Sequence, residues 1–335
     1  MFTTIQQSFD RERVPGVTFD DLDIALVETT IRAGLDSGRY SGPRDPRAYL
    51  RRFGGVVADG PVLHPTVAGV LAFTHEPERW LTASGIDIAL YRSDQASPTQ
   101  SRVRQVRGSI FDVVDSTVAT LQDECTIGRL EGARVVNELD TPLVALRELT
   151  TNAVVHRDLS LFGSQVRIQV FPRYIEWSSP GGLPANITIE TLLTAQFSRN
   201  PSLAQFLFHR AYIEKFGMGL DLVIETMRRE RLSIPEFHDD RHSFRVRVQR
   251  RQLLADRSSD LSTREGRAEA IMALFQERGT WRQRELIERL QIPRSTVQRD
   301  LEDLVRQRRL VARGATRSRM YTLPQHENAE LRMQN

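Results

Sequence analysis

Cysteine and long apolar runs are almost absent from this sequence of 335 residues. The single cysteine, Cys125, excludes an internal disulfide and any zinc site built from a cysteine cluster. No run of about 18 apolar residues occurs, which argues against a membrane-spanning helix. The first residues, MFTTIQQSFDRER, lack the apolar core of a secretory signal. The sequence therefore predicts a cytoplasmic protein without membrane contact.

Lysine is also nearly missing, since Lys215 is the one lysine beside 45 arginines. Arginine binds phosphate with two hydrogen bonds where lysine cannot, but so uniform a bias favours genome base composition as its cause. The net charge is +3, and residues 251–324 alone carry +6. With 40% apolar and 27% charged residues, the chain is expected to form two or three folded domains, the last of them basic.

Hydrophobic periodicity predicts an α+β body before residue 250. Apolar residues recur at helical spacing in some segments and alternate in others, as buried helices and half-buried strands require. The expected helices cover residues 64–74, 108–122 and 142–157, the last starting at Thr141 and Pro142. The expected strands cover residues 85–93, 166–171, 174–179 and 243–249. The strands 166–171 and 174–179 form a hairpin.

The last part of the chain follows a different pattern. A polar linker is expected at 255–263, then three helices at 264–278, 281–290 and 294–308, with Thr280 as the N-cap of the second. Two short strands, LVARG and SRMYTL, complete the order. It resembles the winged helix-turn-helix of transcription regulators and covers residues 264–324. The tail 325–335 is expected to be disordered.

A helix-turn-helix places the start of its third helix in the major groove of double-stranded DNA. Arginine can read guanine and glutamine can read adenine, while hydroxyl groups bind phosphate. The expected DNA-binding residues are Arg294, Ser295, Thr296, Gln298 and Arg299 on this helix, and Arg313, Arg317 and Arg319 on the wing. A homodimer on two half-sites is the usual arrangement. Alternatively, the module contacts protein, and its arginines are only solvated.

Three polar residues of the segment 142–157 carry a second type of chemistry. Glu148, Asn152 and His156 are spaced by four residues and so form one stripe of a helix. A carboxylate, an amide and an imidazole in that order could activate water and hold a hydrated Mg²⁺. The spacing alone equally fits the polar face of an ordinary amphipathic helix.

Two glycine pairs follow at positions that suit phosphate binding. Gly181 and Gly182 end a strand, and Gly217 and Gly219 precede a helix. Glycines before a helix let backbone N–H groups approach phosphate oxygens, although turns also use such pairs. The fixed order of the three elements is more specific than any one of them.

In these elements the sequence resembles the GHKL (Bergerat-fold) ATPases, the superfamily of gyrase, MutL and the histidine kinases. It looks most like the bacterial RecG-like or AlbA/Schlafen-linked regulators. The matching signatures are ALRELTTNAVVHRDLSLFGSQVRI, IEWSSPGGLP, FSRNPSLAQFL and YIEKFGMGLDLV. The resemblance implies a Bergerat-type α/β sandwich over residues 81–254, preceded by a mainly helical region at 1–80. No Gly-x-x-x-x-Gly-Lys-[Ser/Thr] loop supports helicase action.

The resemblance also implies roles for individual residues, with ATP and Mg²⁺ as ligands. Glu148 would be the catalytic general base, and Asn152 would hold Mg²⁺. The other ATP-binding residues would be His156, Asp158, Ser179, Gly181, Gly182, Ser198, Arg199, Asn200, Lys215, Gly217 and Gly219.

Two features depart from the family pattern. Ser179 stands where the superfamily has the aspartate that accepts the adenine amino hydrogen. Members of this branch usually begin with an AlbA/Schlafen-like domain, and the sequence is expected to start just after it, so the protein either lacks this function or borrows it from a partner protein.

These observations predict an ATP-binding and ATP-hydrolysing DNA-binding transcription regulator, in which nucleotide state controls the winged helix. An alternative is a repressor that does not hydrolyse ATP and uses the GHKL fold as a nucleotide sensor or dimerisation module. A third reading is an accessory subunit of a mobile-element or phage-defence system.

Overall fold

A computed structural model describes residues 8–94, 96, 101–131, 134–184, 187–194, 197–214, 219–251, 264–290, 292–314 and 320–324. The chain divides into two compact units, Met1–Arg251 and Gln252–Asn335, which are described separately. Over these described ranges, no helix has the length and apolar character needed to cross a bilayer. The fold is α+β, as the sequence predicts.

Unit 1 is built around a six-stranded mixed sheet with the strand order β4-β3-β7-β8-β10-β9. The strands β3 and β7 pair parallel, and the other neighbours pair antiparallel. The strands are β3 (Ile86–Tyr91), β4 (Ser101–Val106), β7 (Val166–Val170), β8 (Tyr174–Pro180), β9 (Glu236–Asp239) and β10 (Ser243–Gln249). The predicted hairpin 166–179 is therefore present as β7 and β8, whereas β4 and β9 were not predicted.

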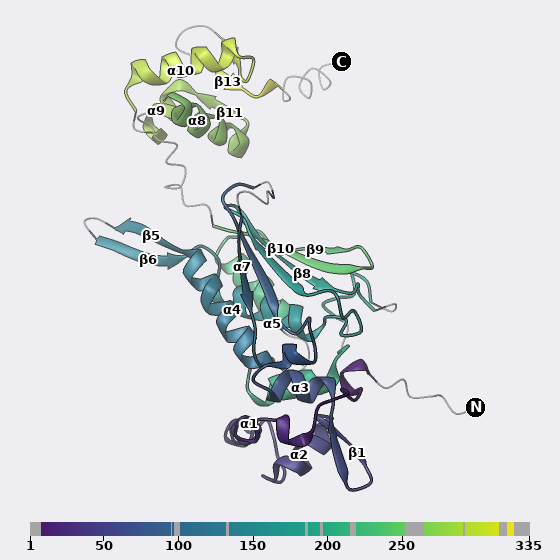
Figure 1. The fold of residues 1–335 in the computed structure, drawn as a ribbon. Helices are drawn as coiled ribbons and strands as arrows, with labels where there is room; N and C mark the ends of the chain where they lie inside the picture. The colour runs from purple at the N-terminus through teal and green to yellow at the C-terminus, as the bar shows by residue number, and fades with distance from the viewer. Residues whose placement is uncertain are drawn as a thin grey trace. The chain divides into compact units, whose positions relative to one another are not determined.

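Helices cover one face of this sheet (Figure 1). They are α4 (Ile110–Cys125), α5 (Leu143–Val155) and α7 (Gly219–Arg229), and α6 (Pro201–His209) packs below them. The apolar side of α5, including Leu146, Leu149 and Ala153, is buried in the core. This helix begins one residue later and ends two residues earlier than expected, with Pro142 as its N-cap, and the Thr141 hydroxyl donates to Asp140 Oδ1 at 2.9 Å.

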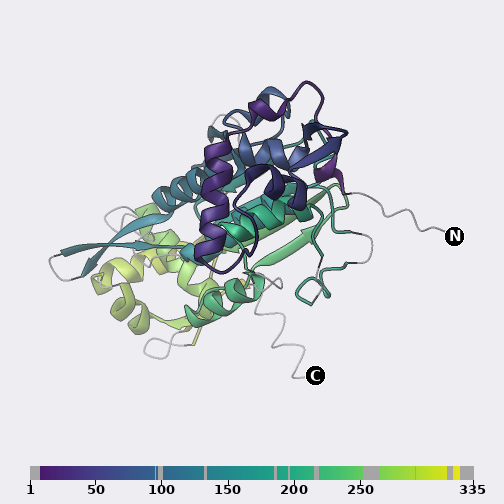
Figure 2. The same ribbon diagram turned by 90° about the horizontal axis from the view of Figure 1, so that it is seen from below.

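The N-terminal elements share the core of unit 1. One apolar cluster runs from Val14 through α3 to Val248 of β10. Figure 2 shows these elements, in purple and blue, against the middle of the chain, where α1 and α3 contact α6. They are η1 (Phe9–Arg11), η2 (Phe19–Asp21), α1 (Ile24–Asp36), α2 (Pro46–Phe53), β1 (Val56–Asp59), β2 (Val62–Pro65), α3 (Val67–Phe73) and η3 (Pro77–Arg79).

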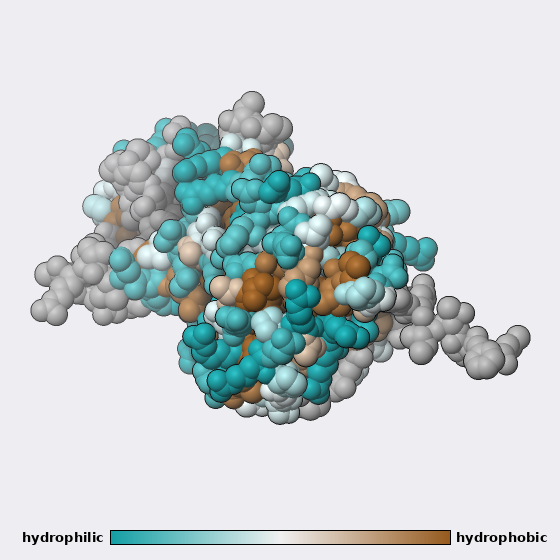
Figure 3. Space-filling view, turned by 60° about the horizontal axis from the view of Figure 1, so that its bottom comes forward, coloured by the Kyte–Doolittle hydropathy of each residue, from teal (hydrophilic) through white to brown (hydrophobic). Residues whose placement is uncertain are grey.

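The hairpin of β5 (Thr126–Glu131) and β6 (Arg134–Leu139) projects from the body of unit 1 (Figure 1). Arg251 holds its base through ion pairs with Glu138 and with Glu230, the latter at 2.7 Å. On the face turned forward in Figure 3, apolar residues form small patches between hydrophilic ones. This face therefore presents a broken rather than a continuous apolar surface.

Unit 2 contains three helices and a three-stranded antiparallel sheet with the order β11-β13-β12. The elements are α8 (Arg264–Arg278), β11 (Thr280–Arg282), α9 (Gln283–Leu290), α10 (Arg294–Arg306), β12 (Val311–Arg313) and β13 (Met320–Thr322). The N-cap expected at Thr280 is wrong. Thr280 lies in β11, paired with Thr322, because Trp281 packs against the core and its indole donates to the Leu274 carbonyl at 2.7 Å.

Unit 2 has its own core, to which α8, α9 and α10 contribute Phe275, Leu286 and Leu301. A buried ion pair joins two of these helices, with Arg267 Nε of α8 2.6 Å from Asp300 Oδ2 of α10. A buried carboxylate is costly unless it is paired, so this contact fixes the side of α10 that faces inward. Arg294, Gln298 and Arg299 are consequently on the exposed side.

Candidate functional site

One pocket of about 420 Å³ lies on the helix-covered side of the sheet in unit 1. Its walls come from α5, the strands β8 and β10, the segments that follow β8 and precede α6, and the start of α7. It brings together nine residues predicted from the sequence: Glu148, Asn152, His156, Ser179, Gly181, Gly182, Ser198, Arg199 and Gly219. Positions spread over some seventy residues therefore meet in one cavity.

Apolar side chains of two neighbouring strands form part of the wall. Trp177 of β8 pairs with Val246 of β10, and Ser179 pairs with Phe244, so all four face the same side. The Trp177 indole is buried and donates to Thr150 Oγ1 at 3.1 Å, which fixes its ring. This wall offers a flat apolar surface to an aromatic ligand. The alternation of both strands could have indicated it from the sequence.

Glu148 is half-buried in the pocket, near the start of α7. A Cβ atom at Gly219 would lie 2.2 Å from Glu148 Oε2, so a larger residue there would require the Glu148 carboxylate to move. Burial raises the pKa of Glu148, and the charge of Glu214 raises it further, whereas Arg147 opposes both. The carboxylate is thus a stronger base than an exposed glutamate would be.

Asn152 and His156 follow Glu148 along α5, one turn apart, and line the same pocket. His156 is the C-cap of the helix. The surrounding protein lowers its pKa to about 4, and the nearby Arg199 guanidinium contributes to this shift. The imidazole of His156 is therefore uncharged at pH 7.

Ser179 is buried at the end of β8 and donates its hydroxyl hydrogen to the Ala153 carbonyl at 2.7 Å. Its oxygen lone pairs remain available on the pocket side, since a hydroxyl can donate once and accept twice. Ser179 can accordingly accept a hydrogen bond from a ligand in the pocket.

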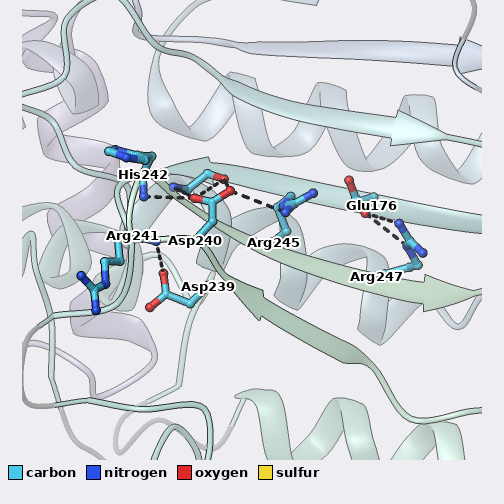
Figure 4. A network of polar contacts seen from close by, with 8 residues as sticks. Glu176, Asp239, Asp240, Arg241, His242, Arg245 and Arg247 are labelled. Atoms are coloured by element: carbon cyan, nitrogen blue, oxygen red, sulfur yellow. Dashed lines mark hydrogen bonds and ion pairs between the residues drawn. The ribbon is translucent and has the colours of Figure 1, made fainter.

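The turn between β9 and β10 supports Gly181 and Gly182. Their backbone N–H groups donate to the carbonyls of His242 at 2.8 Å and Arg241 at 3.2 Å. The turn is closed by Asp240, whose carboxylate accepts from neighbouring backbone N–H groups within the polar network of Figure 4. A Cβ on Gly182 would lie 2.6 Å from the Arg241 Cα. Close backbone packing therefore requires this glycine, independently of any ligand.

Arg199 crosses the pocket rim, where Nη2 donates to the Gly182 carbonyl at 2.6 Å. Ser198 beside it has a buried hydroxyl for which the structure gives no hydrogen-bond partner. Asn200 does not line the pocket, because its amide donates to the carbonyls of Val155 at 2.7 Å and Arg157 at 2.8 Å. It thereby joins the start of α6 to the end of α5.

Asp158 is also outside the pocket lining, and its Oδ1 accepts from the backbone and side chain of Ser160. Lys215 and Gly217 lie outside the described residues, as do Arg317 and Arg319 of the expected wing. Arg313 is in β12, and Ser295 is exposed near the start of α10, while Thr296 is half-buried there.

Sequence reasoning missed Ile213 and Glu214, which line the pocket between α6 and α7. Neither residue lies in a helix or strand, so no periodicity marks them. No group of three or more histidine, cysteine or acidic side chains poised to hold a metal is found among the residues placed by the structure. A divalent cation would therefore need ligand oxygens besides those of Glu148 and Asn152.

Comparison with known proteins relates this chain to one family model and to solved structures. Residues 163–248, from β7 to β10, match the family model described as "Putative ATP-dependent DNA helicase recG C-terminal". The crystal structure of the DIP2311 protein from Corynebacterium diphtheriae aligns with a TM-score of 0.57 at 20% identity, which shows similarity of fold alone. The alignment covers 97% of this chain and 66% of that one. No curated protein matches the sequence. The family match supports a GHKL-like ATPase-type domain in this chain.

Proposed function

We propose that this protein binds and hydrolyses ATP in the pocket of unit 1 and binds DNA through unit 2, as a transcription regulator. The observation that carries the proposal is the convergence of Glu148, Asn152 and Ser179 on one cavity that also has an apolar wall. The family match over β7 to β10 covers the strands of that wall and supports a nucleotide as the ligand.

The pocket has the properties that an adenine nucleotide requires. Its volume of about 420 Å³ is in the usual range for ligand sites. Trp177 and Phe244 would pack against the base, and Ser179 would accept from its amino group. The free hydroxyl of Ser198 and the Arg199 guanidinium are hydrogen-bond donors suited to phosphate oxygens. The uncharged His156 adds a further hydrogen-bonding group.

Glu148 would orient and deprotonate the attacking water, a role for which its raised pKa suits it. Asn152, one turn further along α5, would hold Mg²⁺ through its amide oxygen. When bound, Mg²⁺ would neutralise phosphate charge during transfer. Gly219 keeps the start of α7 close to Glu148, so the N-terminal amides of that helix would face the phosphates.

Unit 2 supports the DNA-binding part of the proposal. The order α8-β11-α9-α10-β12-β13 resembles that of a winged helix-turn-helix, in which α10 would be the recognition helix. Its exposed residues include Arg294, Ser295, Gln298 and Arg299. A homodimer would present two such helices to two half-sites, and nucleotide binding would alter their spacing by favouring one of two states.

The experiment measures ATP binding and hydrolysis by the wild type and by Glu148→Gln, with and without duplex DNA. The variant should bind ATP but hydrolyse it about 10²- to 10⁴-fold more slowly, because it lacks the general base. Glu225→Gln changes an exposed glutamate of α7 and serves as the matched control. A wild-type protein that neither binds nor cleaves ATP with Mg²⁺ present would contradict the proposal.

One observation favours a second candidate, a DNA-binding nucleotide sensor without turnover. Ser179 provides a neutral acceptor in place of a carboxylate, and a neutral hydrogen bond contributes less to binding than a charged one. Saturable ATP binding by the wild type, with no hydrolysis that Glu148→Gln reduces, would select this alternative.

A further inference from the structure

Arg39 reaches the pocket wall from the N-terminal region of unit 1. It lies in the loop after α1, and its Nη1 donates to the Ile213 carbonyl at 2.8 Å. Its Nη2 lies 2.6 Å from Glu214 Oε1. The guanidinium carbon also lies 5.0 Å from the centre of the Phe208 ring. The Arg39 side chain is 19% exposed and that of Glu214 is 52% exposed, so the ion pair is open to water, whereas the contact with the Ile213 carbonyl is partly buried.

The two residues that Arg39 binds belong to an irregular segment that closes the pocket between α6 and α7. A second contact holds this segment from the other side, where the Tyr212 hydroxyl donates to Asp115 Oδ2 of α4 at 2.6 Å. Backbone hydrogen bonds tie Ala211 and Tyr212 to the end of α6, through the carbonyls of Phe208 at 3.0 Å and Leu207 at 2.9 Å. The contacts of Arg39 act on the two residues that follow. Arg39 supplies the contacts to the residues that face the cavity.

We propose that Arg39 is a positioning residue for nucleotide binding, which holds Ile213 and Glu214 in place and so makes the N-terminal region part of the site. This inference rests on the proposed function. An exposed ion pair contributes little, but Arg39 binds a carboxylate and a backbone carbonyl at once and stacks on an aromatic ring. These combined contacts fix the geometry of the wall rather than only its charge.

The contact also places a cation beside Glu214, which lines the same pocket as Glu148. Glu214 is an acidic neighbour of Glu148, and Arg39 holds the Glu214 carboxylate at a defined position. Releasing that carboxylate would let it move in a pocket meant for an anionic ligand. Loss of Arg39 should thus weaken nucleotide binding without removing any group that contacts the ligand.

The test compares Arg39→Ala, Arg39→Lys and the charge-exchange pair Arg39→Glu with Glu214→Arg in the full chain. Arg32→Ala changes an exposed arginine of α1 and is the matched control. Two quantities are measured: the affinity for a fluorescent ATP analogue with Mg²⁺, and hydrogen exchange of the amides at 210–214. The unfolding temperature shows whether each variant folds.

Arg39→Ala should weaken ATP-analogue binding about tenfold and speed exchange at residues 210–214. Arg39→Lys, and Arg39→Glu combined with Glu214→Arg, keep the ion pair. Each should therefore restore part of the affinity and part of the protection from exchange. Unchanged exchange and affinity in a folded Arg39→Ala would overturn the inference, as would equal effects in Arg32→Ala. If the wild type binds no nucleotide, the proposed function fails, and the positioning role is then decided by exchange alone.

Discussion

The carboxylate of Asp10 caps the backbone of Ser202, although 192 positions separate them in the sequence. Asp10 Oδ2 accepts from the Ser202 N–H at 2.7 Å and from the Leu203 N–H at 3.1 Å, and the side chain is fully buried. These N–H groups lie in the first turn of α6, and the side chain of its N-cap residue, Asn200, makes no capping hydrogen bond. Asp10, near the start of the chain, thus caps α6. This helix directly follows Ser198 and Arg199, which line the pocket.

Replacing Asp10 by alanine should lower the free energy of unfolding by about 2–3 kcal/mol, because two buried N–H groups lose their acceptor. The midpoint of urea unfolding measures this loss. Asp20→Ala removes an exposed carboxylate and should change stability by less than about 0.5 kcal/mol. Equal midpoints for the two variants would show that Asp10 is not an effective cap.

A methyl group at Gly219 should impair catalysis more than stability. In Gly219→Ala the new Cβ would meet Glu148 Oε2 and displace the carboxylate, while alanine favours the helix that starts there. We expect ATP hydrolysis to fall about 10²-fold, as for a misplaced catalytic group. Gly163→Ala is the control, because a Cβ there meets nothing within 4 Å. Full activity of Gly219→Ala would show that Gly219 does not determine the position of the Glu148 carboxylate.

The pH dependence of hydrolysis should reflect the pKa of Glu148, on which the charges of Glu214 and Arg147 have opposite effects. Activity should rise with pH as this carboxylate loses its proton, since a general base must be ionised. Glu214→Gln removes a charge that raises the Glu148 pKa, so the rise should shift to lower pH. Arg147→Gln removes a charge that lowers this pKa, so the rise should shift to higher pH. Shifts of the same sign in both variants would contradict the assignment.

The double variant Arg294→Ala with Arg299→Ala should bind duplex DNA more weakly, because two exposed cations of α10 are lost. If each contacts a phosphate, the slope of log affinity against log salt should decrease by about 2. Arg284→Ala on α9, where the side chain is 89% exposed, controls for net charge. An unchanged slope and affinity would favour a protein partner for unit 2.

Local patterns predict α5 and the hairpin of β7 and β8, because the residues that define the periodicity and the turn lie close together in the sequence. The same reasoning placed Thr280 at a helix cap, since it could not show that Trp281 pairs with a distant strand. The contacts of Arg39 with Glu214 and of Asp10 with Ser202 join residues 175 and 192 positions apart. Such contacts arise only from tertiary packing, and no spacing rule indicates them.

The hydroxyl of Ser179 has a consequence for the choice of base. A carboxylate only accepts hydrogen bonds, so it repels the carbonyl edge of guanine by charge. A hydroxyl can accept from the amino group of adenine or rotate and donate to the carbonyl group of guanine. At Ser179, this rotation would break the hydrogen bond to the Ala153 carbonyl. In the nucleotide site proposed above, discrimination between purines would then depend on one neutral hydrogen bond, about 1 kcal/mol, instead of on electrostatic exclusion. Such a site would respond to the ratio of ATP to GTP as much as to the amount of either.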